Sequence, residues 1–163
     1  MGYSTRFEGT LSFVGEVTVA DIRLMKLMFD EKFDDHPEWR EHVRSQPNTK
    51  NIGWVDLCFT DNLDGIQWDG SEKTYGLEHV ITALIAEVRK QNPSFGLSGE
   101  LQAQGEDFDD RWILRIEHGR AVKVPVEVKS IRCPECGHEW EPEDEAERER
   151  PIVPHSKDCG GED

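Results

Sequence analysis

Three cysteines and one histidine near the C-terminus have the types and the spacing of zinc ligands. Two residues separate Cys133 from Cys136, and three separate His155 from Cys159, which gives the pattern C-x2-C-x18-H-x3-C. Thiolates and imidazoles suit tetrahedral Zn²⁺, and four filled positions favour a structural site over a catalytic one. The alternative is a disordered acidic tail with a redox-capable cysteine pair. The pattern predicts one structural zinc ion as a cofactor.

The segment that carries these ligands has few other means of folding. Its apolar content is nearly limited to four side chains, which are Ile131, Trp140, Ile152 and Val153. A bound metal would supply the missing stability. Aliphatic periodicity also ends near this point, so we expect an α+β domain over residues 1–129 and an acidic zinc-binding tail over residues 130–163.

A second candidate site lies where a predicted strand turns into a predicted helix. Connections of this kind often carry functional residues. The candidates at this turn are Trp68, Asp69, Glu72 and Lys73. A purely local role is the alternative, and it is favoured: Trp68 would cover the core and Asp69 would bond the turn backbone. In that case the other two would decorate the helix entry.

A cluster of acidic residues forms the third candidate site. It comprises Glu106, Asp107, Asp109 and Asp110. Such a run either holds a divalent cation or forms a solvated loop between strands, and the solvated loop is favoured. Neither a nucleophile elbow nor a phosphate-binding loop is present in the sequence. We therefore predict no catalytic residue and favour a non-enzymatic role.

Composition restricts the partners of this chain. The net charge is -15 at pH 7, with 33% charged residues, and the last 33 residues alone contribute -7. A field of this sign repels nucleic-acid backbones and anionic membranes, and it is compatible with basic partners. Because no run approaches the ~20 apolar residues of a membrane span, and the start shows no signal-peptide pattern, we expect a cytoplasmic protein.

Periodicity predicts the elements of the first half of the chain. Residues 3–13 alternate as a half-buried strand with Phe7 and Leu11 inward, and Thr18 with Asp21 forms a capping box. The box opens a helix over residues 19–33. A loop over residues 34–51 contains a helical turn near residues 37–43, and strands follow at 54–60 and 66–68. Cys58, in the first of these strands, is expected to be a small core residue.

The second half contains the clearest helix, over residues 77–88, with apolar side chains spaced i, i+3, i+4. Strands are expected at 97–104, 112–116 and 121–128, where Pro125 indicates a sheet edge. The predicted order is β-α-β-β-α-β-β-β. We expect an α+β fold with two helices on one face of a mainly antiparallel sheet that buries these patterns, including the alternating valines of the last strand.

Three stretches resemble a family of small proteins encoded by bacteriophages and prophages. They are the opening MGYST that leads into Phe7–Leu11, the turn WDGSEK at residues 68–73, and GELQAQGED at residues 99–107 followed by DRW at 110–112. The resemblance covers about residues 1–120 and does not include the tail. It implies a phage accessory protein made in a bacterial host cytoplasm, and it assigns no catalytic residue.

Two classes of function remain, with a third behind them. The first is an interaction protein that binds a host or phage protein, such as a defence or transcription component, and a DNA mimic is a special case of it. The second is a nucleic-acid-binding protein that uses the zinc module, although glutamates surround that module. The third is an enzyme that acts through the turn at Trp68–Lys73. The sequence indicates no oligomeric state.

Overall fold

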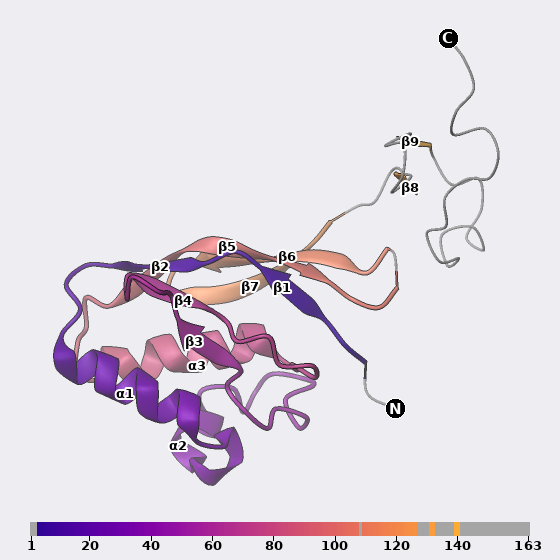
Figure 1. Cartoon of the computed structure of the whole chain (residues 1–163). Coiled ribbons are helices and arrows are strands. Elements are labelled where there is room, and N and C mark those ends of the chain that lie inside the picture. The colour runs from indigo at the N-terminus through magenta and orange to yellow at the C-terminus, as the bar shows by residue number, and fades with distance from the viewer. Residues whose placement is uncertain (1–2, 108, 127–130, 133–138, 141–163) are drawn as a thin grey trace.

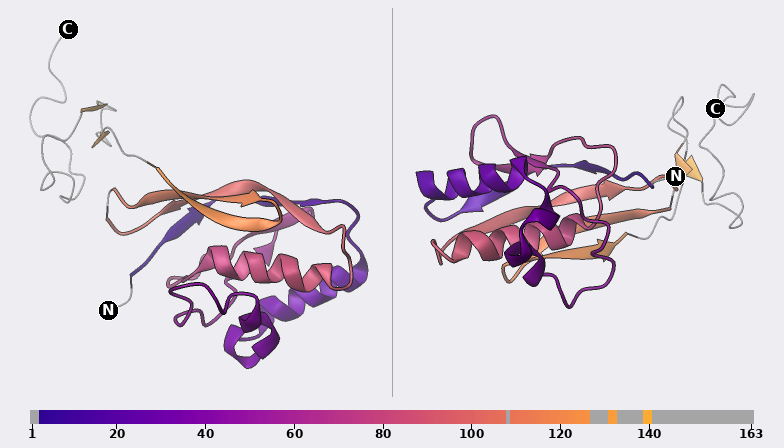
Figure 2. Two further views of the ribbon diagram at one scale, coloured as in Figure 1. Left: turned by 180° about the vertical axis from the view of Figure 1, so that it is seen from behind. Right: turned by 90° about the horizontal axis from the view of Figure 1, so that it is seen from below.

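The computed structural model describes residues 3–107, 109–126, 131–132 and 139–140 of the 163. Its body is a seven-stranded antiparallel sheet with the helices on one side (Figure 1). The same layering is visible from behind and from below in Figure 2. The α+β fold and the antiparallel sheet are therefore confirmed.

The sheet has the strand order β3-β4-β2-β5-β6-β7, and β1 pairs with β5 beyond the end of β2. Its strands are β1 Arg6–Glu8, β2 Leu11–Val14, β3 Leu57–Phe59, β4 Gly65–Trp68, β5 Gly96–Gln104, β6 Arg111–Glu117 and β7 Arg120–Pro125. The helices are α1 Val19–Asp30, α2 Pro37–Glu41 and α3 Leu77–Arg89, with a 3-10 turn, η1, at Phe33–Asp35. The predicted order differs at two points: the first strand is split, and the expected turn near residues 37–43 is the helix α2.

Helix α1 begins at the predicted capping box. The Thr18 side chain accepts a hydrogen bond from the Asp21 N–H (3.2 Å), and the Asp21 carboxylate accepts one from the Thr18 N–H (3.0 Å). The helix ends at Asp30 and not at Phe33, because Glu31 adopts an extended conformation. Phe33 instead starts the 3-10 turn, with its side chain buried.

The buried carboxylate of Asp21 also joins α1 to the end of α3. It accepts hydrogen bonds from Gln91 Nε2 (2.9 Å) and Asn92 Nδ2 (2.7 Å), and the residue is only 1% exposed. Burial alone would raise the pKa of Asp21, but the hydrogen bonds from Thr18, Gln91 and Asn92 stabilise the ionised form and lower it below its usual value. Two helices are thus tied together at one charged group.

Helix α3 places its apolar stripe against the sheet, as its sequence predicts. The buried members of the stripe include Leu77, Val80, Ile81, Leu84, Ile85 and Val88. They meet inward-facing side chains of the central strands, among them Leu11, Ile66, Leu101 and Leu114. The core therefore lies between the sheet and the helices.

Two glycines mark the break in the first strand, Gly9 in the strand itself and Gly99 in its partner β5. Gly9 and Gly99 both have left-handed backbone angles, with φ of 112° and 109°. A Cβ on Gly9 would lie 2.9 Å from the carbonyl oxygen of Glu100, and one on Gly99 would lie 3.0 Å from that of Thr10. The strand predicted over residues 3–13 is therefore broken into β1 and β2, although its register against β5 is the same on both sides.

The strand predicted over residues 54–60 is also shorter than expected. Asp56 has a left-handed backbone (φ 56°), so regular pairing is limited to Leu57–Phe59. Trp54 forms an isolated bridge with Lys32 and is exposed. Cys58 is partly buried within β3, which agrees in part with its expected core position.

The valines of β7 do not face the core, which corrects the prediction. Ala121 is paired with Ile116, and that side of the strand faces α3, where the Ala121 N–H donates to Thr82 Oγ1. Because strand side chains alternate, Val122, Val124 and Val126 face the opposite side of the sheet. The prediction that β7 is an edge strand is confirmed, because β7 ends the strand order.

Candidate binding face

The predicted zinc ligands Cys133, Cys136, His155 and Cys159 lie outside the described residues. Two short strands, β8 Ile131–Arg132 and β9 Glu139–Trp140, form an antiparallel pair on either side of the two cysteines in the sequence. The zinc site and the boundary near residue 129 therefore remain predictions.

The turn at residues 68–73 has the geometry expected for a purely structural role, the alternative that the sequence favoured. Asp69 Oδ1 accepts hydrogen bonds from the Ser71 N–H (2.9 Å) and the Ser71 hydroxyl (2.6 Å). Trp68 Nε1 donates to Thr74 Oγ1 (2.8 Å), and the indole packs edge-on against Phe7 at 5.7 Å. These contacts hold the turn and cover the core.

A second carboxylate lies beside this turn. Burial raises the pKa of Asp56, and the nearby charge of Asp69 raises it further, while hydrogen bonds from Ser71 and Thr74 partly oppose this. Two carboxylates alone do not define a ligand site. The remaining candidates of the turn, Glu72 and Lys73, are exposed.

The acidic loop after β5 anchors the start of the chain. Glu106 Oε1 accepts the Ser4 N–H (2.7 Å), and Asp110 Oδ2 accepts the Tyr3 hydroxyl (2.5 Å). The Asp107 N–H donates to that same hydroxyl (3.3 Å). Burial and the hydrogen bond to Asp110 raise the pKa of Tyr3. Asp109 is exposed.

No catalytic or metal-binding group forms from these candidates in the described part of the chain. Within residues 3–107 and 109–126, no cluster of three or more His, Cys, Asp or Glu side chains could hold a metal ion. Asp69, Glu72 and the acidic loop also lie outside the linings of three surface hollows, one on the sheet and two beside α2. In the described part of the chain, the turn at residues 68–73 and the acidic loop therefore do not converge on a common site, as the enzyme hypothesis would require.

The side of the sheet opposite to the helices presents its side chains in ordered rows. The strand register aligns Arg6, Gln104 and Arg111 across β1, β5 and β6, and the next row contains Glu8, Gln102, Ile113 and Val124. A third row contains Glu100, Arg115 and Val122. We call this side of the sheet the open face.

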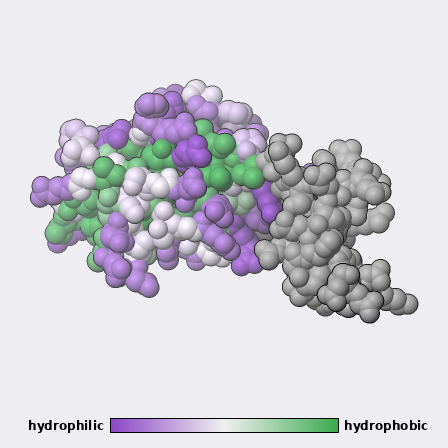
Figure 3. Space-filling view, turned by 90° about the horizontal axis from the view of Figure 1, so that it is seen from above, coloured by the Kyte–Doolittle hydropathy of each residue, from purple (hydrophilic) through white to green (hydrophobic). Residues whose placement is uncertain are grey.

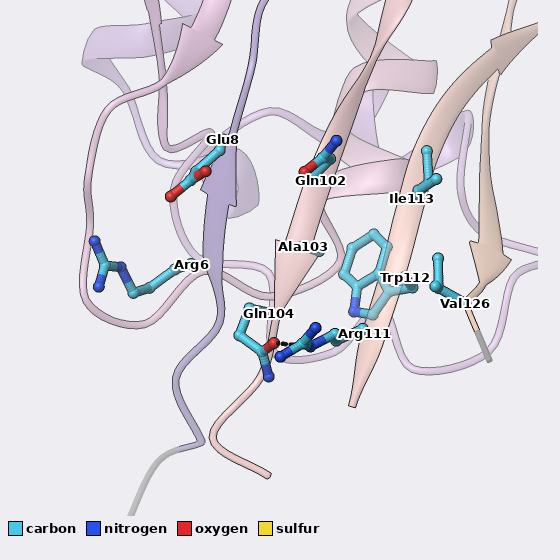
Figure 4. A pocket seen from close by; sticks show the side chains of 9 residues that line it. All are labelled: Arg6, Glu8, Gln102, Ala103, Gln104, Arg111, Trp112, Ile113 and Val126. Carbon is cyan, nitrogen blue, oxygen red and sulfur yellow. Dashed lines mark hydrogen bonds between the residues drawn. The ribbon is translucent and has the colours of Figure 1, made fainter. Parts of the chain in front are cut away.

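A hollow of about 480 Å³ lies at one end of the open face. Figure 4 shows the residues that line it, with Arg6 and Glu8 on β1, Gln102 and Gln104 on β5, and Ile113 on β6. Arg111 Nε donates to Gln104 Oε1 (2.6 Å) across its floor. The hollow thus combines guanidinium and amide groups with an aliphatic wall that ends at Val126.

Aliphatic side chains occupy the β6–β7 side of the open face. Val122 and Val126 are 36% and 39% exposed, and Val124 and Ile113 are partly buried between them. Hydrophobic side chains are visible among hydrophilic ones when the sheet is viewed from this side (Figure 3). Within the described residues, no helix covers this face, since the helices lie on the other side (Figure 1).

The exposed edge of β7 presents few main-chain hydrogen-bond donors. The N–H of Val126 donates to a carbonyl oxygen of β6 (3.0 Å), so in this antiparallel pair the N–H groups of residues 121, 123 and 125 point away from the sheet. The Ala121 N–H is bonded to Thr82 Oγ1, and Pro125 has no N–H. Of the three outward positions, Lys123 alone presents a donor.

The edge at β3 differs from that at β7. Helix α1 packs against this strand, with the rings of Phe29 and Phe59 centred 4.9 Å apart. Leu57, in the same strand, is only 3% exposed as a whole residue. The β7 edge therefore lacks a full row of main-chain donors, and the β3 edge is only three residues long.

Sequence reasoning singled out turns and acidic loops and missed this face. The signal was present in the strict alternation of Val122, Val124 and Val126 around Pro125. Alternation shows that the valines share a side but not which side the helices cover.

No helix within the described residues is long and apolar enough to cross a membrane. No family model matches the sequence, and no curated protein or solved structure matches it.

Proposed function

We propose that this chain is a binding protein that holds a partner protein on the open face. The observation that carries the proposal is the aliphatic strip of Val122, Val124, Val126 and Ile113 beside the arginine-lined hollow, on a face that no helix of the described residues covers. Contiguous exposed apolar groups with a polar rim are typical of protein interaction sites.

The mixture of groups on the open face supports a protein partner. Arg115 lies 3.5 Å from the carboxylate of Glu100 and 3.8 Å from that of Glu117, so part of the charge is already balanced on the face itself. Guanidinium groups and aliphatic side chains side by side suit an interface with an apolar centre and polar surroundings. A nucleic-acid backbone would require a more basic face.

The small number of main-chain donors on the β7 edge indicates the mode of binding. Strand addition uses free main-chain groups, and the β7 edge has lost two of its three outward donors to Thr82 and Pro125. Recognition therefore proceeds through side chains of the open face. The proposal includes the setting that the family resemblance implies, a phage accessory protein in a bacterial cytoplasm whose partner is a host or phage protein.

The test is a matched pair of valine substitutions. Val124→Glu places a charge in the centre of the strip, whereas Val19→Glu places the same charge at the exposed start of α1, where Val19 is 68% exposed. We expect tagged wild-type protein from infected or lysogenic cells to retain a stoichiometric partner, Val19→Glu to retain it, and Val124→Glu to lose it. A partner retained equally by both variants would contradict the open-face proposal, as would the absence of any partner.

The zinc-binding tail is a separate part of the proposal. Its support is the ligand spacing of Cys133, Cys136, His155 and Cys159. Elemental analysis of protein never exposed to chelator is expected to give one zinc per chain, and Cys133→Ser or Cys159→Ser is expected to release it. Metal-free protein with a protease-resistant tail would exclude a structural zinc site.

A further inference from the structure

A separate hollow of about 380 Å³ lies between α2, α3 and β7. Three segments that are distant in the sequence line it. The end of α2 and the residues after it contribute His42, Val43 and Gln46, α3 contributes Glu78, His79 and Thr82, and β7 contributes residues 120–123. Its size suits a small molecule.

The cationic residues of this hollow are not neutralised by carboxylates. In the part of the chain that the structure describes, neither Arg120 nor Lys123 forms an ion pair, and Lys123 Nζ lies 4.4 Å from the centre of the Trp112 ring. A third hollow of the protein differs in this respect, because Arg44 there pairs with Glu41 at 3.2 Å. In a chain of net charge -15, two cations without a carboxylate partner at one hollow stand out.

Two imidazoles add hydrogen-bonding groups to the same hollow. His42 Nε2 lies 2.7 Å from Glu87 Oε1, a buried carboxylate that also pairs with Lys90 at 2.5 Å. That contact fixes the ring and leaves Nδ1 without a partner among the described residues. His79 Nε2 lies 3.5 Å from Glu78 Oε1, the one carboxylate that lines the hollow.

The remaining polar side chains of the wall are Gln46 and Thr82. The Thr82 hydroxyl donates to the Glu78 carbonyl (2.8 Å) and accepts the Ala121 N–H (3.0 Å). Val43 and Ala121 contribute apolar surface. A ligand would therefore meet cations, imidazoles and an amide together with aliphatic surface.

We infer that this hollow binds a small organic molecule through an oxyanion, either a carboxylate or a phosphate group. A guanidinium recognises both groups through paired N–H donors, and an ammonium supplies a compact second charge. The inference goes beyond the proposed partner binding, because the hollow is lined by residues of α2, α3 and β7 and shares only Val122 with the valine strip.

Two probes distinguish the sources of the anion: inorganic phosphate and succinate, each titrated into the full chain at constant ionic strength. Amide chemical shifts in NMR spectra are expected to change saturably at residues 78–82 and 120–123 with at least one probe. The probe that saturates identifies the group. Shifts that stay linear with both probes, or that spread over the whole surface, would overturn the inference.

Substitutions supply the second readout. Arg120→Gln is expected to weaken binding about 10-fold, because it removes one charge-assisted contact, and Lys123→Gln to weaken it in the same direction. Arg44→Gln, at an exposed site that is ion-paired elsewhere, is the matched control and is expected to leave affinity unchanged. Equal affinity in all three variants would also overturn the inference.

Discussion

The two sides of the sheet follow different rules. On the helix side, charged and polar groups such as Asp21 and Glu87 are buried and bonded, and apolar side chains are almost fully covered. On the open face, Val122 and Val126 are exposed and arginines lie beside amides and carboxylates. Side chains that are covered and satisfied contribute to folding, whereas exposed apolar groups without an internal partner indicate a surface kept for binding. The comparison predicts that substitutions on the two sides separate stability from function.

The largest expected difference in the free energy of unfolding is between substitutions at two neighbouring residues of β5. Leu101 is 0% exposed and faces the helices, whereas Gln102 lies in the second row of the open face. Leu101→Ala leaves a cavity and should lower the free energy of unfolding by about 3 kcal/mol, whereas Gln102→Ala should change it by less than about 0.5 kcal/mol. Urea denaturation measures both values. Similar losses in the two variants would remove the distinction between the faces.

Asp21→Asn should give the next largest loss in the free energy of unfolding, about 2 kcal/mol, because it replaces a buried ionised hydrogen-bond acceptor. The folded pKa of Asp21 is lowered below 3.8, so its contribution is fully present above that value and is lost as the pH falls through the folded pKa. The stability difference between wild type and Asp21→Asn should therefore narrow in acid. A difference that stays constant from pH 7 to pH 2 would contradict the role given to the charge.

Substitution of His36 should lower the stability of the fold by a smaller amount than Asp21→Asn, with the opposite pH dependence. Its ring stacks on Trp39 at 3.7 Å and contacts the carboxylates of Glu31 and Glu38. Burial alone would lower the pKa of His36, but the hydrogen bonds to these carboxylates outweigh it and raise the pKa above 6.5. The stabilisation is therefore complete below pH 6.5 and is lost as the pH rises through the folded pKa.

The check for His36 is thermal denaturation of wild type and His36→Gln across a pH series. The stability advantage of the wild type should be largest in mild acid and should shrink in alkaline solution. An advantage that grows with pH would show that the imidazole is neutral in the folded protein.

The smallest effect on stability is expected on the open face itself. Val124→Ser should change the free energy of unfolding by less than about 0.5 kcal/mol, because the side chain is only partly covered. The same variant should nevertheless weaken binding of the partner. A large loss of stability would show that this valine belongs to the core of the folded chain.

Local chemistry explains which elements could be predicted from the sequence. The Thr18–Asp21 capping box and the apolar stripe of α3 depend on residues close together in the chain, and both are confirmed. The break at Gly9 could not be predicted from alternation, because it depends on the Glu100 carbonyl of a distant strand. The layout of the sheet is likewise a property of tertiary contacts.

The candidate site was harder to predict for the same reason. Trp68 and Asp69 have chemistry that attracts attention, yet their partners lie in the same turn or in the adjacent core. The valines of β7 have no reactive or charged groups that attract attention. Whether they face the core or the open face depends on Ala121 being the residue that faces α3. The side of the sheet that α3 covers decides this, and no local pattern specifies that side.

The protected edges of the sheet also matter for how copies of the protein behave when crowded together. Main-chain pairing between rims is the usual start of fibril growth and domain exchange. Here one rim contains Pro125, and the other is a strand of only three residues, Leu57–Phe59. These two rims are therefore poor templates for an endless ribbon, even though the valines of β7 remain in contact with water.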